Sequence, residues 1–178
     1  MSPKQRKQML ANQAKLTYER LREVLRYEPE TGECTWLAST GKRKDLIGKR
    51  ACSLDKVDGY RRIKVDGVSY LSSRLAVFFI TELWPDDEVD HKNTDPSNDR
   101  WENLREATKP QQNANTRERS RSGLPKGVWR NQRWGGFNAR IKINRKQRHL
   151  GTYSTPEAAH AAYARAAERL HGEFARLQ

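Results

Sequence analysis

The chain has few of the features that would place it in a membrane or in an oxidising compartment. Its longest apolar run, Leu75 to Ile80, is far shorter than the roughly 20 residues of a membrane-spanning helix. Residues 1–7 lack the apolar segment of a signal peptide. The two cysteines, Cys34 and Cys52, are not a close pair. They could in principle bridge, but reduced thiols are the expected state, so the sequence predicts a soluble intracellular protein.

Apolar residues are also scarce. Hydrophobic residues make up 35% of the 178 residues, and the mean hydropathy is -1.03. A composition of this kind does not favour one large core, so the length has room for one ordinary domain or two small ones.

Acidic residues are nearly absent from both ends of the chain. Residues 1–16 hold no acidic side chain and residues 116–178 have a net charge of +10, while residues 17–115 have a net charge of −1 and the whole chain +13. This distribution predicts a flexible basic arm at 1–16 and a core that acts on something the basic ends hold. A phosphate backbone suits it best. A merely soluble basic surface and a ribosome-associated structural protein are the alternatives.

The first half of the chain alternates short helices and strands. A short helix is expected after Thr17, a fair N-cap, and should end at Pro29 and Gly32. Residues 34–36 have the character of a strand. Residues 60–71 alternate around the turn pair Asp66-Gly67 and predict a hairpin.

A helix with an apolar surface nearly all round is expected from Ser72 to Leu83, before the stop at Trp84-Pro85. Val89 then opens a strand, a long polar loop follows, and Leu104 to Thr108 form a second strand. The sequence Thr108-Lys-Pro-Gln111 matches a capping box and starts a helix. The polar side chains on these elements include Asp90, His91, Gln112 and Asn113.

The remainder is predicted to form a second domain after a charged linker at 116–122. Three short strands at 127–130, 136–143 and 148–153 precede a final helix that begins after Thr155.

Asp90 and His91 are suited to phosphodiester hydrolysis. This reaction needs a water that is deprotonated in line with the phosphorus, and a histidine with a pKa near 6.5 can accept that proton. It also needs a cation, for which Asp90 and an amide oxygen are hard donors that fit Mg²⁺ or Mn²⁺. Successive strand residues point to opposite faces, so the pair needs a distorted strand end. The alternative is an incidental pair on a surface strand.

Residues 17–115 resemble the HNH endonucleases of phages and prophages, including the homing enzymes. The residues that carry this resemblance are Ser73-Arg-Leu-Ala76, Trp84-Pro85, Val89-Asp-His91, Asp99-Arg-Trp-Glu-Asn-Leu-Arg105, Ala107-Thr108 and the helix rich in Gln and Asn. The resemblance implies a ββα-metal fold with a divalent cation, Mg²⁺ or Mn²⁺.

Within this resemblance each site residue has a role. His91 would be the general base, Asp90 a metal ligand, and Asn103 would orient His91 and hold the loop. A second metal ligand is implied on the helix, where the family normally has Asn. The matching position is Gln112, and Asn113 is the alternative.

Residues 123–178 resemble the AP2 DNA-binding domain, a plant transcription-factor module also found fused to phage HNH nucleases. The residues that carry this resemblance are Gly127-Val128, Trp134-Gly135, Phe137-Asn-Ala-Arg-Ile141, His149-Leu-Gly-Thr-Tyr153, Thr155-Pro-Glu-Ala-Ala159, Ala162-Tyr163 and Leu170-His-Gly172. It implies a three-stranded antiparallel sheet in the major groove with one helix behind it. The candidate DNA contacts are Arg130, Arg133, Trp134, Arg140, Lys142, Arg148 and His149. Trp129 and Trp134 are alternatives for the core.

The expected protein is therefore α+β, with a nuclease domain at 17–115 that includes a hairpin and helix before its ββα part. It would hydrolyse double-stranded DNA with a divalent metal, nicking one strand per active site unless two chains assemble. We expect no membrane and no required protein partner, and a place near the nucleoid of a bacterial or phage-infected cell. The alternatives are a DNA-binding regulator with an inactive nuclease site and an RNA-binding basic protein.

Overall fold

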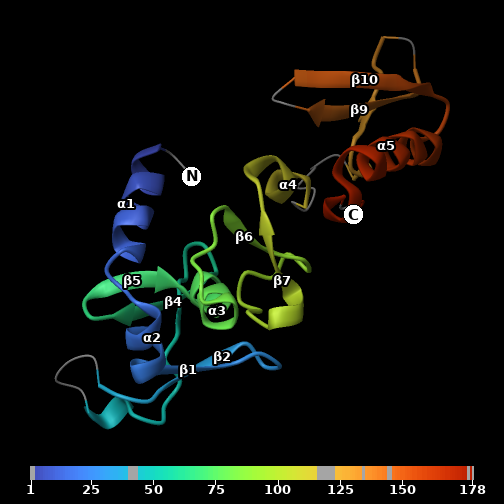
Figure 1. Ribbon diagram of the computed structural model, residues 1–178. Coiled ribbons are helices and arrows are strands. Elements are labelled where there is room, and N and C mark those ends of the chain that lie inside the picture. The colour runs from blue at the N-terminus through green and yellow to red at the C-terminus, as the bar shows by residue number, and fades with distance from the viewer. Residues whose placement is uncertain are drawn as a thin grey trace. The chain divides into compact units, whose positions relative to one another are not determined.

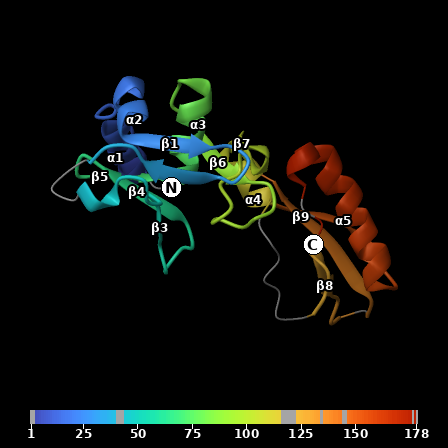
Figure 2. The same cartoon turned by 90° about the horizontal axis from the view of Figure 1, so that it is seen from below.

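The computed structural model describes residues 3–39, 44–115, 123–133, 135–143, 146–175 and 177, with only the backbone described at 3–5, 110 and 113. The chain forms two compact units, a first unit of residues 1–106 and a second unit of residues 107–178. Both combine helices with small sheets, which confirms the predicted α+β class (Figures 1 and 2). The predicted domain limits stay predictions, and the predicted linker at 116–122 lies outside the described residues.

The first unit alternates short helices with short strands. Its helical elements are α1 (Pro3–Gln13), α2 (Tyr18–Val24), the 3-10 turn η1 (Lys44–Leu46), α3 (Ser72–Thr81) and the 3-10 turn η2 (Trp101–Asn103). Its strands are β1 (Leu25–Glu28), β2 (Glu33–Trp36), β3 (Ser53–Leu54), β4 (Arg61–Val65), β5 (Val68–Leu71), β6 (Glu88–His91) and β7 (Leu104–Ala107). They form three sheets, ordered β1-β2, β3-β4-β5 and β6-β7.

The beginning of the chain differs from the sequence prediction. Residues 3–13 form α1, where an arm without regular structure was expected. The segment is rich in Lys, Gln, Arg, Met, Leu and Ala, which favour helix without needing an apolar face, and Pro3 occupies the first helical position. The tyrosine hydroxyl of Tyr70 donates to the carbonyl of Asn12 at 2.9 Å and ties the end of α1 to β5.

The helix predicted after Thr17 is confirmed at its start but not at its end. The Thr17 hydroxyl caps α2 by accepting from the amide of Arg20 at 3.2 Å. The helix ends at Val24, and Leu25–Glu28 form strand β1, paired antiparallel with β2. The expectation of a helix up to Pro29 is wrong because Leu25 and Tyr27 are buried while Arg26 is exposed, the alternation of a half-buried strand.

The hairpin around Asp66-Gly67 is confirmed. Val65 pairs with Val68, and the two residues between them have φ of 46° at Asp66 and 83° at Gly67. Positive φ at both positions is the requirement of the tight turn that matches strand twist. The Arg20 guanidinium donates to both carboxylate oxygens of Asp66 at 2.9 and 3.0 Å, which joins this turn to α2.

Helix α3 lies at the centre of the first core, as predicted from its apolar surface. Its residues Ser72 to Phe78 are all buried, and Arg74 among them donates to the carbonyls of Pro85 and Asp87. The first core consists of buried residues of α3 and of the segments packed around it, and includes Leu16, Leu21, Val24, Leu25, Tyr27, Cys34, Trp36, Ile63, Val65, Tyr70, Leu75, Ala76, Val77, Phe78, Val89 and Leu104. Each fully buried Leu, Ile or Val contributes about 1.5–3 kcal/mol.

Both cysteines are free thiols, in agreement with the expected reduced state. Burial raises the pKa of the Cys34 thiol to about 12, so it stays protonated. Among the described residues, no helix is both long and apolar enough to cross a bilayer.

The second unit is one sheet covered by one long helix. Its elements are α4 (Lys109–Ala114), β8 (Val128–Arg130), β9 (Phe137–Ile143), β10 (Lys146–Tyr153), α5 (Pro156–His171) and the 3-10 turn η3 (Gly172–Phe174). The sheet is antiparallel in the order β10-β9-β8, and α5 runs along one of its faces (Figure 1).

Small residues bring α5 close to this sheet. The hydroxyl of Thr155 caps the helix, as predicted, by accepting from the amide of Ala158 at 3.2 Å. Val128 and Ala139 on the sheet pack against Ala159 of the helix. Gly127 passes so near the ring of Tyr163 that a Cβ there would lie 2.1 Å from a ring carbon, and its φ of 79° also favours glycine.

Candidate functional site

Asp90 and His91 stand at the end of β6, where the chain leaves the two-stranded sheet for a polar loop. Val89, Asp90 and His91 are all buried. The two polar side chains are bonded to different charged residues, because neighbouring strand residues point in different directions. Asp99 of the polar loop approaches His91, and Arg105 of β7 approaches Asp90.

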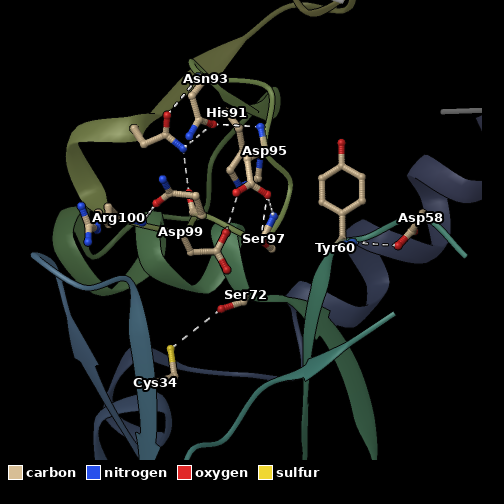
Figure 3. A network of polar contacts seen from close by, with 12 residues as sticks. Cys34, Asp58, Tyr60, Ser72, His91, Asn93, Asp95, Ser97, Asp99 and Arg100 are labelled. Carbon is tan, nitrogen blue, oxygen red and sulfur yellow. Dashed lines mark hydrogen bonds and ion pairs between the residues drawn. The ribbon is translucent and has the colours of Figure 1, made fainter. Parts of the chain in front are cut away.

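His91 is bonded to Asp99. Its Nε2 lies 2.9 Å from Oδ1 of Asp99, with 4% and 1% of the two side chains exposed (Figure 3). A carboxylate only accepts hydrogen bonds, so in a neutral imidazole the proton lies at Nε2 and the lone pair at Nδ1. The second carboxylate oxygen of Asp99, Oδ2, is buried and has no hydrogen-bond partner among the residues that the structure describes.

Asp90 is bonded to Arg105 of β7. Both Nε and Nη2 of Arg105 donate to Oδ2 of Asp90, each at 3.1 Å. The pair is nearly buried, with 11% of the arginine and 8% of the aspartate side chain exposed. A charge-assisted pair in such a setting holds the carboxylate in one place. Sequence reasoning gave no role to Arg105 or Asp99, although both stand in the motif that it singled out.

Asn103 holds the loop between β6 and β7. Its Oδ1 accepts from the amide of Asn93 at 3.0 Å, and its Nδ2 donates to Oδ1 of Asn93 at 3.1 Å and to the carbonyl of Asn98 at 2.7 Å. Its carbonyl accepts from the amide of Lys92 at 2.9 Å. This geometry suits the predicted role of holding the loop, while a direct effect of Asn103 on His91 stays a prediction.

Asp95 tightens the same loop further (Figure 3). Its Oδ1 accepts from the amide of Ser97 at 2.9 Å and from the hydroxyl of Ser97 at 2.7 Å. These bonds lower the pKa of the Asp95 carboxyl, and the bond from the Ser97 hydroxyl has the larger effect. The loop is therefore built from side chains that bond backbone groups two residues away, which gives it a defined shape without regular structure.

Tyr60, which directly precedes β4, packs against the ring of His91. The two ring centroids are 5.8 Å apart with the planes inclined at 55°. Burial raises the pKa of the Tyr60 hydroxyl, and the charge of Asp90 raises it further. Gly59 before it lies close to the loop, since a Cβ there would be 3.0 Å from Cγ of Pro96. Sequence reasoning had placed Tyr60 only in the hairpin.

The metal-binding side chains of the site suit a cation that keeps part of its hydration shell. In the part of the chain that the structure describes, no three His, Cys, Asp or Glu side chains come together as a metal cluster. Mg²⁺ is usually held by one or two carboxylates together with water and phosphate oxygens. Asp90 fits that pattern, and a cation there would share the carboxylate with Arg105.

The predicted second ligand lies on α4, in the second unit. One of the two bonds of the capping box predicted at its start is present, because Oε1 of Gln111 accepts from the amide of Thr108 at 2.8 Å, and it also accepts from the Thr108 hydroxyl at 2.7 Å. Oε1 of Gln112 accepts from Nζ of Lys109. The side chain of Asn113 lies outside the described residues, so the alternative between Gln112 and Asn113 stays open.

The sheet of the second unit has an outer face, defined as the face away from α5. Val128, Ala139 and Ile141 pack toward α5, so residues of the opposite alternation lie on the outer face. The pairing of His149 with Arg140 and of Gln147 with Lys142 places those side chains there too. The outer face therefore includes Trp129, Arg140, Lys142, Gln147 and His149.

An aromatic ring and a cation meet on the outer face. Trp129 is 41% exposed, so the alternative of a core tryptophan does not hold for it. The guanidinium carbon of Arg140 lies 5.9 Å from the centroid of the Trp129 ring. Trp129 was not among the candidate contacts, and its alternation with buried Val128 is the signal that could have indicated it.

The other candidate DNA contacts have different positions. Arg148 pairs with Ile141 and so belongs to the alternation of the α5 side, although it is exposed. Arg130 pairs with Phe137, and its guanidinium carbon lies 5.8 Å from that ring's centroid. Arg133 is exposed in the turn after β8, and Trp134 lies outside the described residues.

Comparison with known protein families places one match on this site. Residues 82–114 match the model of the HNH endonuclease family. The matched segment runs from the end of α3 through β6, the polar loop and β7 to α4, and so contains Asp90, His91 and Asn103. The match supports an HNH domain in this part of the chain and, at that level, nuclease activity on DNA. No solved structure matches the chain.

Proposed function

We propose that this protein is a metal-dependent DNA endonuclease that hydrolyses phosphodiester bonds at the Asp90-His91 site. The observation that carries the proposal is the coincidence of two features in one segment. Residues 82–114 match the HNH endonuclease family, and the same segment buries an acid and a histidine side by side at a strand end, each bonded to a charged partner. An incidental surface pair would be exposed and unsupported.

In the proposed reaction, His91 accepts the proton of the attacking water at Nδ1, the lone-pair nitrogen when Nε2–H is bonded to Asp99. Asp90 supplies a carboxylate oxygen to the cation. When bound, a divalent cation such as Mg²⁺ or Mn²⁺ neutralises charge on the leaving and non-bridging phosphate oxygens. Asn103 keeps the loop between β6 and β7 in shape.

The second unit supplies the grip on DNA in this proposal, as an AP2-like domain. Support comes from its three-stranded antiparallel sheet with one helix behind it, and from Arg140, Lys142 and His149 on the outer face. Such side chains can bind phosphate or read guanine edges, and an exposed tryptophan adds a flat apolar surface. One active site per chain predicts nicks, unless two chains assemble.

The test is cleavage of supercoiled plasmid by the full chain with Mg²⁺ or Mn²⁺, with and without EDTA. Loss of a general base costs about 10²- to 10⁴-fold in rate, and this is the expected effect of His91→Ala. His171→Gln is the matched control, because that histidine lies at the end of α5, and it should cleave like the wild type.

Cleavage that survives chelation, or that His91→Ala leaves unchanged, would contradict the proposed site. If specific DNA binding occurs without any metal-dependent cleavage, the alternative of a regulator with an inactive nuclease site is the correct one. A competition between duplex DNA and structured RNA at fixed salt separates both from an RNA-binding protein.

A further inference from the structure

Asp99, the hydrogen-bond partner of His91, is buried with only part of its carboxylate bonded. Asp99 is almost fully buried, at 1% exposure, and within the described part of the chain one of its two carboxylate oxygens has no hydrogen-bond partner. A buried polar group without a partner costs about 1–3 kcal/mol, and more when it is charged. A residue chosen for stability alone would be satisfied or apolar, so its position in the site indicates a role beyond stability.

The backbone of Asp99 is held by a part of the chain far away in sequence, the hairpin of β1 and β2. The hydroxyl of Tyr27 on β1 donates to the carbonyl of Asp99 at 2.7 Å in a buried bond. The amide of Trp101 donates to the carbonyl of Pro29 in the turn of that hairpin, at 3.0 Å. These two bonds hold the chain on both sides of residue 100.

Gly32 completes this support by close contact. A Cβ at Gly32 would lie 2.4 Å from the carbonyl carbon of Asp99 and 2.4 Å from the amide nitrogen of Arg100. Its φ of 72° also lies in the left-handed region, so two independent requirements call for glycine there. The turn of the hairpin is therefore in close contact with the backbone of Asp99 and Arg100.

We propose that Asp99 is the positioning residue of His91, and that the β1–β2 hairpin fixes Asp99 in place for this purpose. Asp99 accepts the Nε2–H of His91, which sets both the direction of the ring and the tautomer with its lone pair at Nδ1. Asp99 touches neither substrate nor cation in this role. The catalytic part of the proposal rests on the proposed function of His91, but the contact itself does not.

The activity test uses Asp99→Asn, which keeps the size of the side chain and removes its charge. Loss of a group that orients a site residue typically costs about 10- to 100-fold, and we expect this loss in kcat with KM unchanged. Thermal stability should stay equal or rise, because a neutral amide is less costly to bury than a carboxylate with an unbonded oxygen. Asp86→Asn, an exposed carboxylate before β6, is the matched control and should change neither.

Tyr27→Phe and Gly32→Ala test the hairpin. Both substitutions should lower kcat and leave KM unchanged. The loss should be larger for Gly32→Ala than for Tyr27→Phe, because the added Cβ displaces Asp99 further. A merely structural role of Asp99 predicts the opposite pattern, a loss of stability with the kcat of the folded protein unchanged. That pattern in Asp99→Asn would overturn the proposal.

A spectroscopic measurement on the metal-free protein tests the contact without any activity. In the full chain with ¹⁵N-labelled histidine, at a pH well above the usual imidazole value of about 6.5, two-bond ¹H–¹⁵N correlations distinguish the two tautomers. We expect His91, assigned through its loss in His91→Ala, to carry its proton on Nε2 as a slowly exchanging signal. Asp99→Ala should abolish this slow exchange, and Asp86→Asn should keep it.

A proton on Nδ1 in the wild type, or a signal that Asp99→Ala leaves unchanged, would overturn the positioning role whether or not the protein cleaves DNA. Conversely, an inactive wild type that shows the Nε2–H signal sensitive to Asp99 would refute the proposed function and support the contact.

Discussion

Four polar residues of the candidate site and Lys142 of the second sheet have opposite environments. Asp90, His91, Asp99 and Asn103 are buried and bonded to neighbouring side chains or backbone. Lys142, in contrast, is exposed on a sheet whose other face is covered by α5.

This difference follows from the two tasks that the proposed function assigns. A group that transfers a proton or holds a cation must be within a fraction of an ångström of one position, and burial among bonded partners provides this. A group that grips phosphate needs reach and solvent, because its energy comes from released counterions. The two kinds of region should therefore respond differently to the same kind of substitution.

The largest effect on stability is expected from Arg105→Ala. The substitution leaves Asp90 buried without its guanidinium partner, and breaking a buried pair in this way costs about 3–5 kcal/mol. Urea denaturation of the full chain measures the loss. Added Mg²⁺ or Mn²⁺ should restore more stability to this variant than to the wild type, since a cation can take the place of the guanidinium.

Arg26→Ala is the matched control for that measurement. This arginine is on β1 with 71% of its side chain exposed, and its loss should change the free energy of unfolding by less than about 0.5 kcal/mol. Equal losses in the two variants would contradict the distinction between a built site and a solvated surface.

An intermediate effect is expected on the outer face. Lys142→Ala should weaken DNA binding about equally for all sequences and reduce the slope of log K against log salt by about one. Its folding stability should stay unchanged because the side chain is exposed. Lys64→Ala, an exposed lysine on β4 of the first unit, is the control. If it changes the slope as much as Lys142→Ala does, the outer face is not the site of the grip.

The smallest effect concerns pH. Burial lowers the pKa of His171 in the second unit, and the charge of Lys126 lowers it further. A group with a lowered folded pKa contributes stability above its unfolded value, so protection in the second unit should begin to fall below about pH 6.5. In the first unit, a hydrogen bond from Arg20 lowers the pKa of Asp66, and hydrogen bonds from Ser97 lower the pKa of Asp95. The loss of protection around these two carboxylates therefore begins only below about pH 4.

Hydrogen exchange of the full chain between pH 7 and pH 5, corrected for intrinsic rates, measures this order. His171→Gln should remove the early loss in the second unit. Protection that falls first around Asp66 and Asp95 would contradict the assignment.

Local signals in the sequence were sufficient for much of the fold. The turn at Asp66-Gly67, the caps at Thr17 and Thr155 and the bond from Gln111 back to the Thr108 amide each act within a few residues, and all are present. Strand β1 was missed because a segment of four residues after a helix has no turn signal to separate it.

The partners of the site could not be predicted in the same way. Asp90 and His91 were identified from their chemistry together with the resemblance of their segment to a nuclease family, but the contact of Asp99 with His91 depends on the conformation of the whole polar loop. That conformation depends in turn on Gly32 and Tyr27, which are more than 60 residues away from Asp99 in sequence. Arg105 needed the sheet of β6 and β7 before its pairing with Asp90 was visible.

The proposed function assigns cleavage to the Asp90-His91 site and DNA binding to the outer face of the second unit. The most direct test of this assignment is to measure the single-turnover cleavage rate and the equilibrium affinity on one DNA. His91→Ala should lower the cleavage rate of the bound complex by about 10²-fold or more with an unchanged Kd. The double variant Arg140→Ala with Lys142→Ala should raise Kd and leave the cleavage rate at saturating protein unchanged. A loss of affinity in the first variant, or a loss of saturated cleavage rate in the second, would contradict the account.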